Sequence, residues 1–193
     1  MYADSHIKEL TYCLDYMRYC RGDIRSIVDM IFAAYKHKQQ VFIIGNGGSA
    51  TTASHFAVDL EKQSAIDGRQ RIRARSLADN IGLITAWAND TNYANVFREQ
   101  LANELNAGDI VICISVSGTS PNIIAAISYA KSARAKVIGF IGTTNHSAED
   151  MKQLADLCIV VPSSNYGVVE DVHLTLTHII AATLRQRIAR CKN

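Results

Sequence analysis

Two segments of the sequence each combine histidine with a carboxylate, a combination that suits metal binding or proton transfer. His55 and Asp59 are four residues apart in a segment expected to be helical, so both side chains project from one face. An isolated pair of this kind more often forms a hydrogen bond than a metal site. Glu170 and His178 lie about 80° apart around the expected last helix, whereas His173 faces elsewhere. Together, His55, Asp59, Glu170 and His178 supply two nitrogens and two carboxylates, a ligand set that suits Zn²⁺.

A loop rich in serine offers a second kind of chemistry. Ser115, Ser117 and Ser120 surround Gly118 between an apolar segment and an expected helix that begins near Pro121. Hydroxyl groups and the N–H groups of a helix N-terminus together form a neutral cradle for phosphate. The alternative is ordinary helix capping by one serine. Three serines exceed what a cap needs, so the pattern favours phosphate binding.

A glycine-rich turn, Gly45-Asn-Gly-Gly-Ser49, follows the apolar residues 41–44 and opens another expected helix. A turn between a buried strand and a helix N-terminus is a site for an anion or a hydroxyl group. The turn has neither the dinucleotide-binding fingerprint nor a P-loop lysine. It therefore indicates a sugar-phosphate ligand rather than a nucleotide.

Hydrophobic periodicity places these loops in an alternating pattern of strands and helices. Residues 5–38 have helical spacing, as two helices with Asp23 as N-cap or as one bent helix. We expect 1–38 to form an N-terminal helical arm that packs on the domain and on another subunit. Beyond the arm, the pattern predicts a single domain spanning 1–193 with an α/β, doubly wound parallel sheet. The expected strands are 41–44, 74–77, 110–115, 137–141 and 157–161. The expected helices are 50–62, 80–87, 93–105, 123–133, 148–155 and 168–190, with a turn at 89–92.

Composition limits the possible partners and the compartment. The 193 residues are 48% hydrophobic and 20% charged, with a net charge of +2, which favours neither a nucleic-acid nor a membrane partner. No apolar run approaches the roughly 20 residues of a membrane span. Residues 1–8 have no apolar h-region, so we expect no signal peptide. The five cysteines, Cys13, Cys20, Cys113, Cys158 and Cys191, show no paired spacing, which predicts reduced thiols and a cytoplasmic location.

Several motifs occur in an order that resembles the sugar isomerase (SIS) domain family, in its phosphoheptose isomerase branch. They are Gly-Asn-Gly-Gly-Ser at 45–49, Ser-His-Phe-Ala at 54–57, Trp-Ala-Asn-Asp at 87–90, Gly-Asp at 108–109, Ile-Ser-Val-Ser-Gly-Thr-Ser-Pro-Asn at 114–122, Val-Pro-Ser at 161–163 and the helix from Glu170 to His178. The resemblance extends from the helical arm to the last helix.

The resemblance implies a flavodoxin-like, three-layer αβα fold and a homotetramer whose active sites lie between subunits, each with one Zn²⁺ ion. It assigns sugar contacts to Asn46, Gly47, Gly48, Ser49, Asn89 and Asp90, phosphate contacts to Ser115, Ser117 and Ser120, and zinc binding to His55, Asp59, Glu170 and His178. Val116, inside the serine loop, and Glu170 are also expected to face the substrate. The family usually has glutamate at position 59, glutamine at position 170 and a hydroxyl residue at position 116.

The implied activity is the aldose–ketose isomerisation of sedoheptulose 7-phosphate to D-glycero-D-manno-heptose 7-phosphate through an enediol. In this hypothesis Asp59 removes the proton next to the carbonyl and His178 handles the proton on the other side. The alternatives are an isomerase of another sugar phosphate, a non-enzymatic SIS protein that binds DnaA, and a sugar-phosphate sensor.

Overall fold

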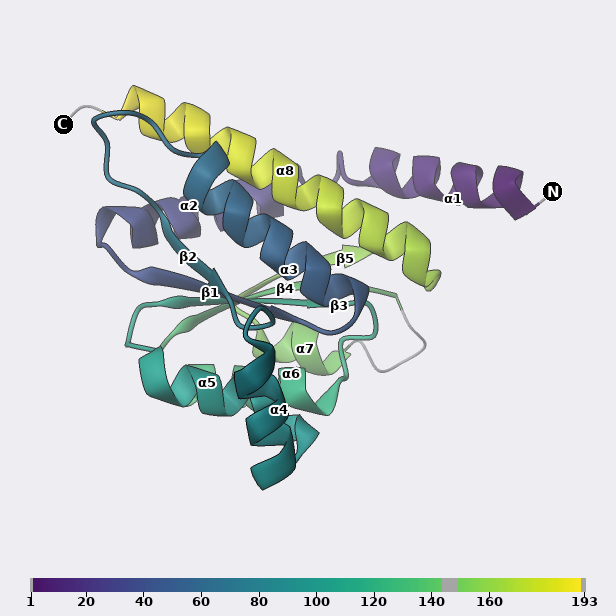
Figure 1. The fold of residues 1–193 in the computed structure, drawn as a ribbon. Coiled ribbons are helices and arrows are strands. Elements are labelled where there is room, and N and C mark those ends of the chain that lie inside the picture. Colours follow the sequence, from purple (N-terminus) through teal and green to yellow (C-terminus); the bar gives the residue numbers. More distant parts are fainter. Residues whose placement is uncertain (1, 144–148, 192–193) are drawn as a thin grey trace.

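The computed structural model describes residues 2–143 and 149–191, which are built around one five-stranded sheet (Figure 1). All strand pairs are parallel, and the strand order is β2-β1-β3-β4-β5. The strands are β1 (Gln40–Gly45), β2 (Arg73–Ser76), β3 (Ile110–Ser115), β4 (Lys136–Gly142) and β5 (Leu157–Val161). The central strands are continuous apolar runs because helices cover both of their faces. The predicted α/β, doubly wound parallel sheet is confirmed.

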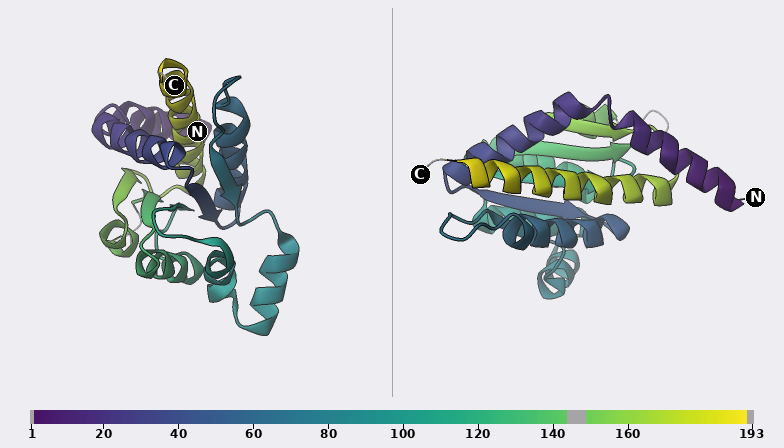
Figure 2. Two further views of the ribbon diagram at one scale, coloured as in Figure 1. Left: turned by 90° about the vertical axis from the view of Figure 1, so that its left-hand side faces the viewer. Right: turned by 90° about the horizontal axis from the view of Figure 1, so that it is seen from above.

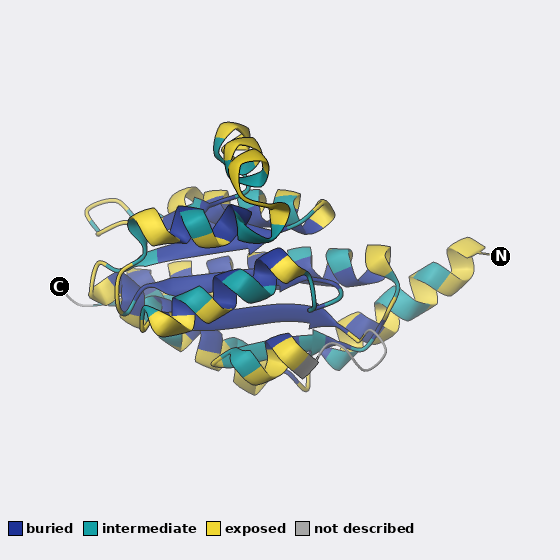
Figure 3. Ribbon diagram, turned by 90° about the horizontal axis from the view of Figure 1, so that it is seen from below, coloured by how far each residue is buried: buried dark blue, intermediate teal, exposed yellow. Residues whose placement is uncertain are grey.

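Two helical layers enclose the sheet (Figure 2). Alternate side chains of each strand point into different layers, so that Val41 and Ile43 belong to one core and Phe42 and Ile44 to the other. The first layer contains α2 (Arg21–Lys36), α3 (Gly48–Val58) and α8 (Tyr166–Arg190). The second layer contains α5 (Val96–Glu104), α6 (Pro121–Ser132) and α7 (Glu149–Leu154). Figure 3 shows the strands as the most deeply buried part of the chain.

The predicted arm consists of two helices, of which only α1 (Tyr2–Tyr16) extends beyond the body of the molecule (Figure 1). The next helix, α2, packs on the sheet through residues such as Ile27 and Ile31. The prediction that Asp23 is an N-cap is wrong. Asp23 lies inside the first turn of α2, where a carboxylate favours the positive end of the helix dipole, and Cys20 occupies the capping position.

Helix α4 (Ile81–Asp90) projects from the second layer, which it contacts through Ile84, Trp87 and Ala88 (Figures 1 and 3). It begins where the Asn80 side chain accepts a hydrogen bond from the backbone N–H of Leu83, and none of its ten residues is buried. The helix continues to Asp90, so the turn predicted at 89–92 starts too early. The helix predicted at 93–105 begins with a short 3₁₀ turn, η2 (Tyr93–Asn95), and only its remainder forms α5.

The glycine-rich turn and the serine loop both lie at the carboxyl edge of the sheet. Because β1 and β3 are parallel neighbours, the turn after β1 and the serine loop after β3 leave the sheet side by side. The helices that follow, α3 and α6, therefore begin at this edge with their N-termini close together. No helix within the described residues is long and apolar enough to cross a membrane.

Candidate functional site

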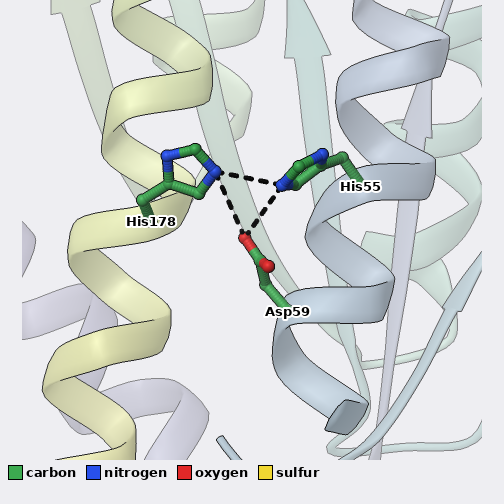
Figure 4. A group of neighbouring side chains, drawn as sticks. All are labelled: His55, Asp59 and His178. Carbon is green, nitrogen blue, oxygen red and sulfur yellow. Dashed lines mark hydrogen bonds and ion pairs between the residues drawn. The ribbon is translucent and has the colours of Figure 1, made fainter. Parts of the chain in front are cut away.

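The structure brings His55, Asp59 and His178 together between two helices (Figure 4). His55 lies near the end of α3, and Asp59 opens the π-helical turn η1 (Asp59–Gln63) that follows. His178 comes from α8, which runs beside α3. The Nε2 atoms of the two imidazoles are 3.0 Å apart. Asp59 Oδ2 lies 3.5 Å from His55 Nε2 and 3.7 Å from His178 Nε2.

This triangle of atoms fits a metal ion. In a tetrahedral site with bonds of about 2.0–2.2 Å, neighbouring ligand atoms are about 3.3–3.5 Å apart, and the three observed distances lie on either side of this range, from 3.0 to 3.7 Å. The Asp59 residue is 7% exposed, and its Oδ2 atom has no hydrogen-bond partner among the described residues. A buried carboxylate oxygen without a donor is costly, and a divalent cation would satisfy it. The three atoms therefore form a candidate metal site that leaves a position for substrate.

Glu170 does not join this group among the described residues, although the sequence placed it in the ligand set. It shares a face of α8 with His178 but lies eight residues earlier, about 12 Å along the axis at 1.5 Å per residue. Its carboxyl group instead lies against Gly48, where an added Cβ atom would come within 2.5 Å of the carboxyl carbon. Glycine at this position thus allows the carboxylate to approach the start of α3.

The serine loop and the glycine turn line one small pocket of about 80 Å³. The start of α3 provides one wall, the start of α6 a second, and the start of α8 a third. Three helix N-termini therefore converge on the pocket, which favours an anion. Its lining residues are Asn46, Ser49, Ser115, Val116, Ser117, Ser120, Tyr166 and Glu170.

Backbone N–H groups of the serine loop donate to Ser115 and Ser117 within the same loop, and neither of these hydrogen bonds caps α6. Ser115 Oγ accepts a hydrogen bond of 3.1 Å from the N–H of Gly118. Ser120 occupies the N-cap position of α6, yet its side chain makes no capping hydrogen bond with the described residues. The alternative reading of the loop, in which one serine caps the helix, is therefore not what the structure has. Gly118 adopts φ +69°, a conformation that lets the loop bend around the pocket.

The other expected substrate residues lie in different places. Gly47 and Gly48 are exposed at the turn, and Gly47 has φ +55° and ψ −125°, which a residue with a side chain rarely adopts. Asn89 and Asp90 are exposed at the end of α4, where the Asn89 amide donates to the Asp90 carboxylate. Neither residue lines the pocket at the serine loop, and neither joins the group of His55, Asp59 and His178, which we call the metal group. Their roles as sugar contacts stay predictions.

Sequence reasoning missed Asn122 and Tyr93. Asn122 is 1% exposed, and its side chain exchanges two hydrogen bonds with Asn46 at 2.8 and 2.9 Å. The Tyr93 hydroxyl donates to the same Asn46 side chain at 3.1 Å. Asn122 was part of a recognised motif but was treated as the beginning of a helix. No signal in the sequence connects Tyr93 with the turn after β1.

The His173 side chain is fully buried against the sheet, as expected from its position on α8, and takes no part in the site. Its ring lies 6.1 Å from that of Phe140. Burial lowers the pKa of His173 to about 4. The backbone of Ile141 opposes this shift, although neither ring nitrogen has a hydrogen bond of normal geometry with the described residues.

Comparisons with known proteins agree with this arrangement. The family described as "SIS domain" matches residues 8–142. The phosphoheptose isomerase of Burkholderia pseudomallei is 34% identical over 165 residues, covering 86% of this chain and 82% of the relative. The solved phosphoheptose isomerase of Neisseria gonorrhoeae is 23% identical, with a TM-score of 0.85, and covers 95% of this chain and 97% of its own. That of Francisella tularensis is 25% identical, with a TM-score of 0.83 and coverages of 96% and 95%. The chain therefore belongs to the SIS domain family and, within it, to the phosphoheptose isomerases.

Proposed function

We propose that this protein is an aldose–ketose isomerase that converts sedoheptulose 7-phosphate to D-glycero-D-manno-heptose 7-phosphate. The observation that carries the proposal is the placement of two polar centres on the same pair of helices. The anion pocket lies at the N-termini of α3 and α8, and the group His55, Asp59 and His178 lies further along them. Family membership supports the same activity.

The spacing of the two centres suits a long substrate. His55 follows Ser49 by six residues, about 9 Å along α3, and the corresponding separation on α8 is about 12 Å. An extended chain of single bonds advances about 1.25 Å per bond, so the phosphorus of a heptose 7-phosphate lies about 9 Å from C2. A pentose 5-phosphate spans only about 6 Å by the same reckoning. A seven-carbon sugar phosphate therefore reaches from the pocket to the reacting groups.

The residues of the metal group are suited to moving a proton between C1 and C2. The phosphate is held by the hydroxyls of Ser115, Ser117 and Ser120, which fixes the open-chain sugar. The carboxylate of Asp59 removes the proton next to the carbonyl, and its burial excludes water from that step. His178 was expected to handle the proton on the oxygen side of the enediol, but its Nε2 atom faces the metal position, so we assign it the role of holding the ion that stabilises those oxygens.

We infer that His55, Asp59 and His178 hold a divalent cation, most simply Zn²⁺ with one ion per subunit. Two imidazoles and a carboxylate form a donor set common in catalytic zinc sites. When bound, the ion polarises the carbonyl and hydroxyl oxygens of the sugar. The carboxylate of Glu170, which lines the pocket, is free to contact sugar hydroxyls from α8.

We also propose a homotetramer with active sites at subunit interfaces and a cytoplasmic location. The exposed side chains of α1, among them Tyr2, Ile7 and Tyr12, and the exposed helix α4 offer surfaces for subunit contact. Asn89 and Asp90 on α4 would then approach a neighbouring subunit's sugar. All five cysteines are free, which suits a reducing compartment.

The test is an NMR assay of sedoheptulose 7-phosphate conversion with chelator-treated protein, before and after Zn²⁺ is added. We expect conversion that depends on the metal and is lost in Asp59→Asn and His178→Ala. Asp67→Asn, which removes an exposed carboxylate, is the matched control and should keep full activity. A wild-type-like rate in Asp59→Asn would contradict the role of that residue. Faster turnover of a pentose or hexose phosphate would instead favour another substrate.

A further inference from the structure

The Asn46 side chain sits at the centre of a hydrogen-bond network that joins three elements. Its Oδ1 accepts from Asn122 Nδ2 at 2.8 Å and from the Tyr93 hydroxyl at 3.1 Å. Its Nδ2 donates to Asn122 Oδ1 at 2.9 Å. The network thus connects the turn after β1, the first turn of α6 and the 3₁₀ turn η2.

The backbone of α6 sets the direction of every bond in this network. The N–H of Ile123 donates to two acceptors, to Asn122 Oδ1 at 3.0 Å and to the carbonyl of Ser120 at 2.9 Å. Turning the Asn122 amide over would place its NH₂ group against that N–H, donor against donor. The backbone therefore fixes the Asn122 amide, and Asn122 in turn fixes the orientation of Asn46.

A fixed orientation determines what Asn46 can offer to a ligand. An amide oxygen has two lone pairs, and those of Asn46 Oδ1 are both used by Asn122 and Tyr93. An amide nitrogen has two N–H groups, and one of them is used by Asn122. Asn46 lines the anion pocket, and its second N–H has no partner among the described residues. The side chain can therefore act toward a ligand only as a donor.

We propose that Asn122 and Tyr93 are positioning residues that hold Asn46 as a hydrogen-bond donor for an oxygen of the substrate phosphate. A phosphate oxygen only accepts hydrogen bonds at neutral pH, whereas a sugar hydroxyl both donates and accepts. A donor alone would suit either ligand oxygen, but Asn46 lines the same pocket as Ser49 and the serine loop, which assigns it to the phosphate subsite rather than to the sugar subsite. This inference rests on the proposed function for the identity of the substrate.

The test measures the binding of inorganic phosphate by calorimetry, which requires no turnover. We expect Asn122→Ser, which retains a residue suited to a helix start, to weaken phosphate binding about tenfold, as for one hydrogen bond to a charged group. In the isomerase assay the same variant should raise KM about tenfold and change kcat less than twofold. Tyr93→Phe, at an exposed position, should weaken phosphate binding two- to threefold, because the Asn46 side chain loses one of the three hydrogen bonds that hold it in place. Ser128→Ala, on the exposed side of α6, is the matched control and should change neither quantity.

The decisive comparison uses the Asn46→Ala background. If Asn122 and Tyr93 act through Asn46, adding either substitution to Asn46→Ala should cause no further loss of phosphate binding. Losses that add would mean a general structural role and overturn the proposal, as would a wild type that binds no phosphate. If Asn122→Ser does not fold, the Tyr93→Phe cycle decides alone, and unchanged phosphate binding in Tyr93→Phe overturns the proposal. Phosphate binding that behaves as expected in a protein that does not turn over sedoheptulose 7-phosphate would refute the proposed function and leave the assignment of Asn46 intact.

Discussion

Replacing His173 with leucine should remove a large part of the protein's loss of stability in mild acid. His173 is fully buried between α8 and the sheet, and burial lowers its pKa from about 6.5 to about 4. Between these values the unfolded chain binds a proton that the folded chain does not. The free energy of unfolding therefore falls as the pH falls from 6.5 to 4, and this contribution is constant outside that window.

The size of the effect follows from the two pKa values. The full difference corresponds to about 3 kcal/mol, and at pH 5 about 2 kcal/mol of it has been lost relative to pH 7. The His173→Leu variant lacks this pH-dependent loss of unfolding free energy, because leucine binds no proton. The change in unfolding free energy between pH 7 and pH 5 should thus be about 2 kcal/mol smaller in the variant than in the wild type, whatever the variant's stability at pH 7.

Urea unfolding at pH 7 and pH 5, with chelator and at one protein concentration, measures this difference. His37→Gln removes an exposed imidazole at the end of α2 and serves as the control for the loss of a histidine. If His173→Leu loses as much stability as the wild type between the two pH values, the ring is protonated in the folded protein and the argument from burial is wrong.

Other consequences of the structure can be checked by simple substitutions and labelling. Gly48→Ala should destabilise the fold by about 1–3 kcal/mol because its methyl group meets the Glu170 carboxylate, and Glu170→Ala in the same chain should relieve that loss in thermal unfolding. Gly47→Ala should cost roughly 1–3 kcal/mol through its backbone angles, and the loss should persist when Glu170 is also replaced. Burial raises the pKa of Cys113 and Cys20, and raises that of Cys158 to about 11, so iodoacetamide at pH 8 should label Cys191 first, as read by mass spectrometry. Labelling of Cys113 in the folded protein would contradict the packing of the central strand.

The strands and both loops were predictable because their signals are local. Apolar runs such as 110–115 are buried on both faces, and each run ends where a polar loop begins. The extent of α4 was not predictable in the same way. Asn89 and Asp90 have the composition of a turn, yet the helix continues through them. The N–H of Thr91 still bonds to the carbonyl of Trp87, so the helix ends only at Thr91, its C-cap.

The ligand set was only partly predictable because helical angle and axial position are separate quantities. The angle between Glu170 and His178 correctly places both side chains toward α3. It says nothing of the two turns that separate them along α8, so each residue meets α3 at a different level. Glu170 meets Gly48 at the start of α3, whereas His178 meets His55 near its end. That α3 lies beside α8 is a tertiary fact, which one sequence does not contain.

The same geometry explains how a shorter carboxylate at position 59 still reaches the metal group. Relative to the glutamate usual in the family, Asp59 lacks one methylene, about 1.5 Å of reach. It lies where α3 changes from α-helical to π-helical hydrogen bonding, at the first residue of η1. A π turn adds a residue to the helical turn and shifts the side chains that follow, a change often found at functional sites. The change begins after Asp59, whose own N–H keeps the α-helical hydrogen bond to the carbonyl of His55. The two side chains therefore stay one helical turn apart, and Asp59 Oδ2 lies within 3.7 Å of both imidazoles although its side chain is shorter.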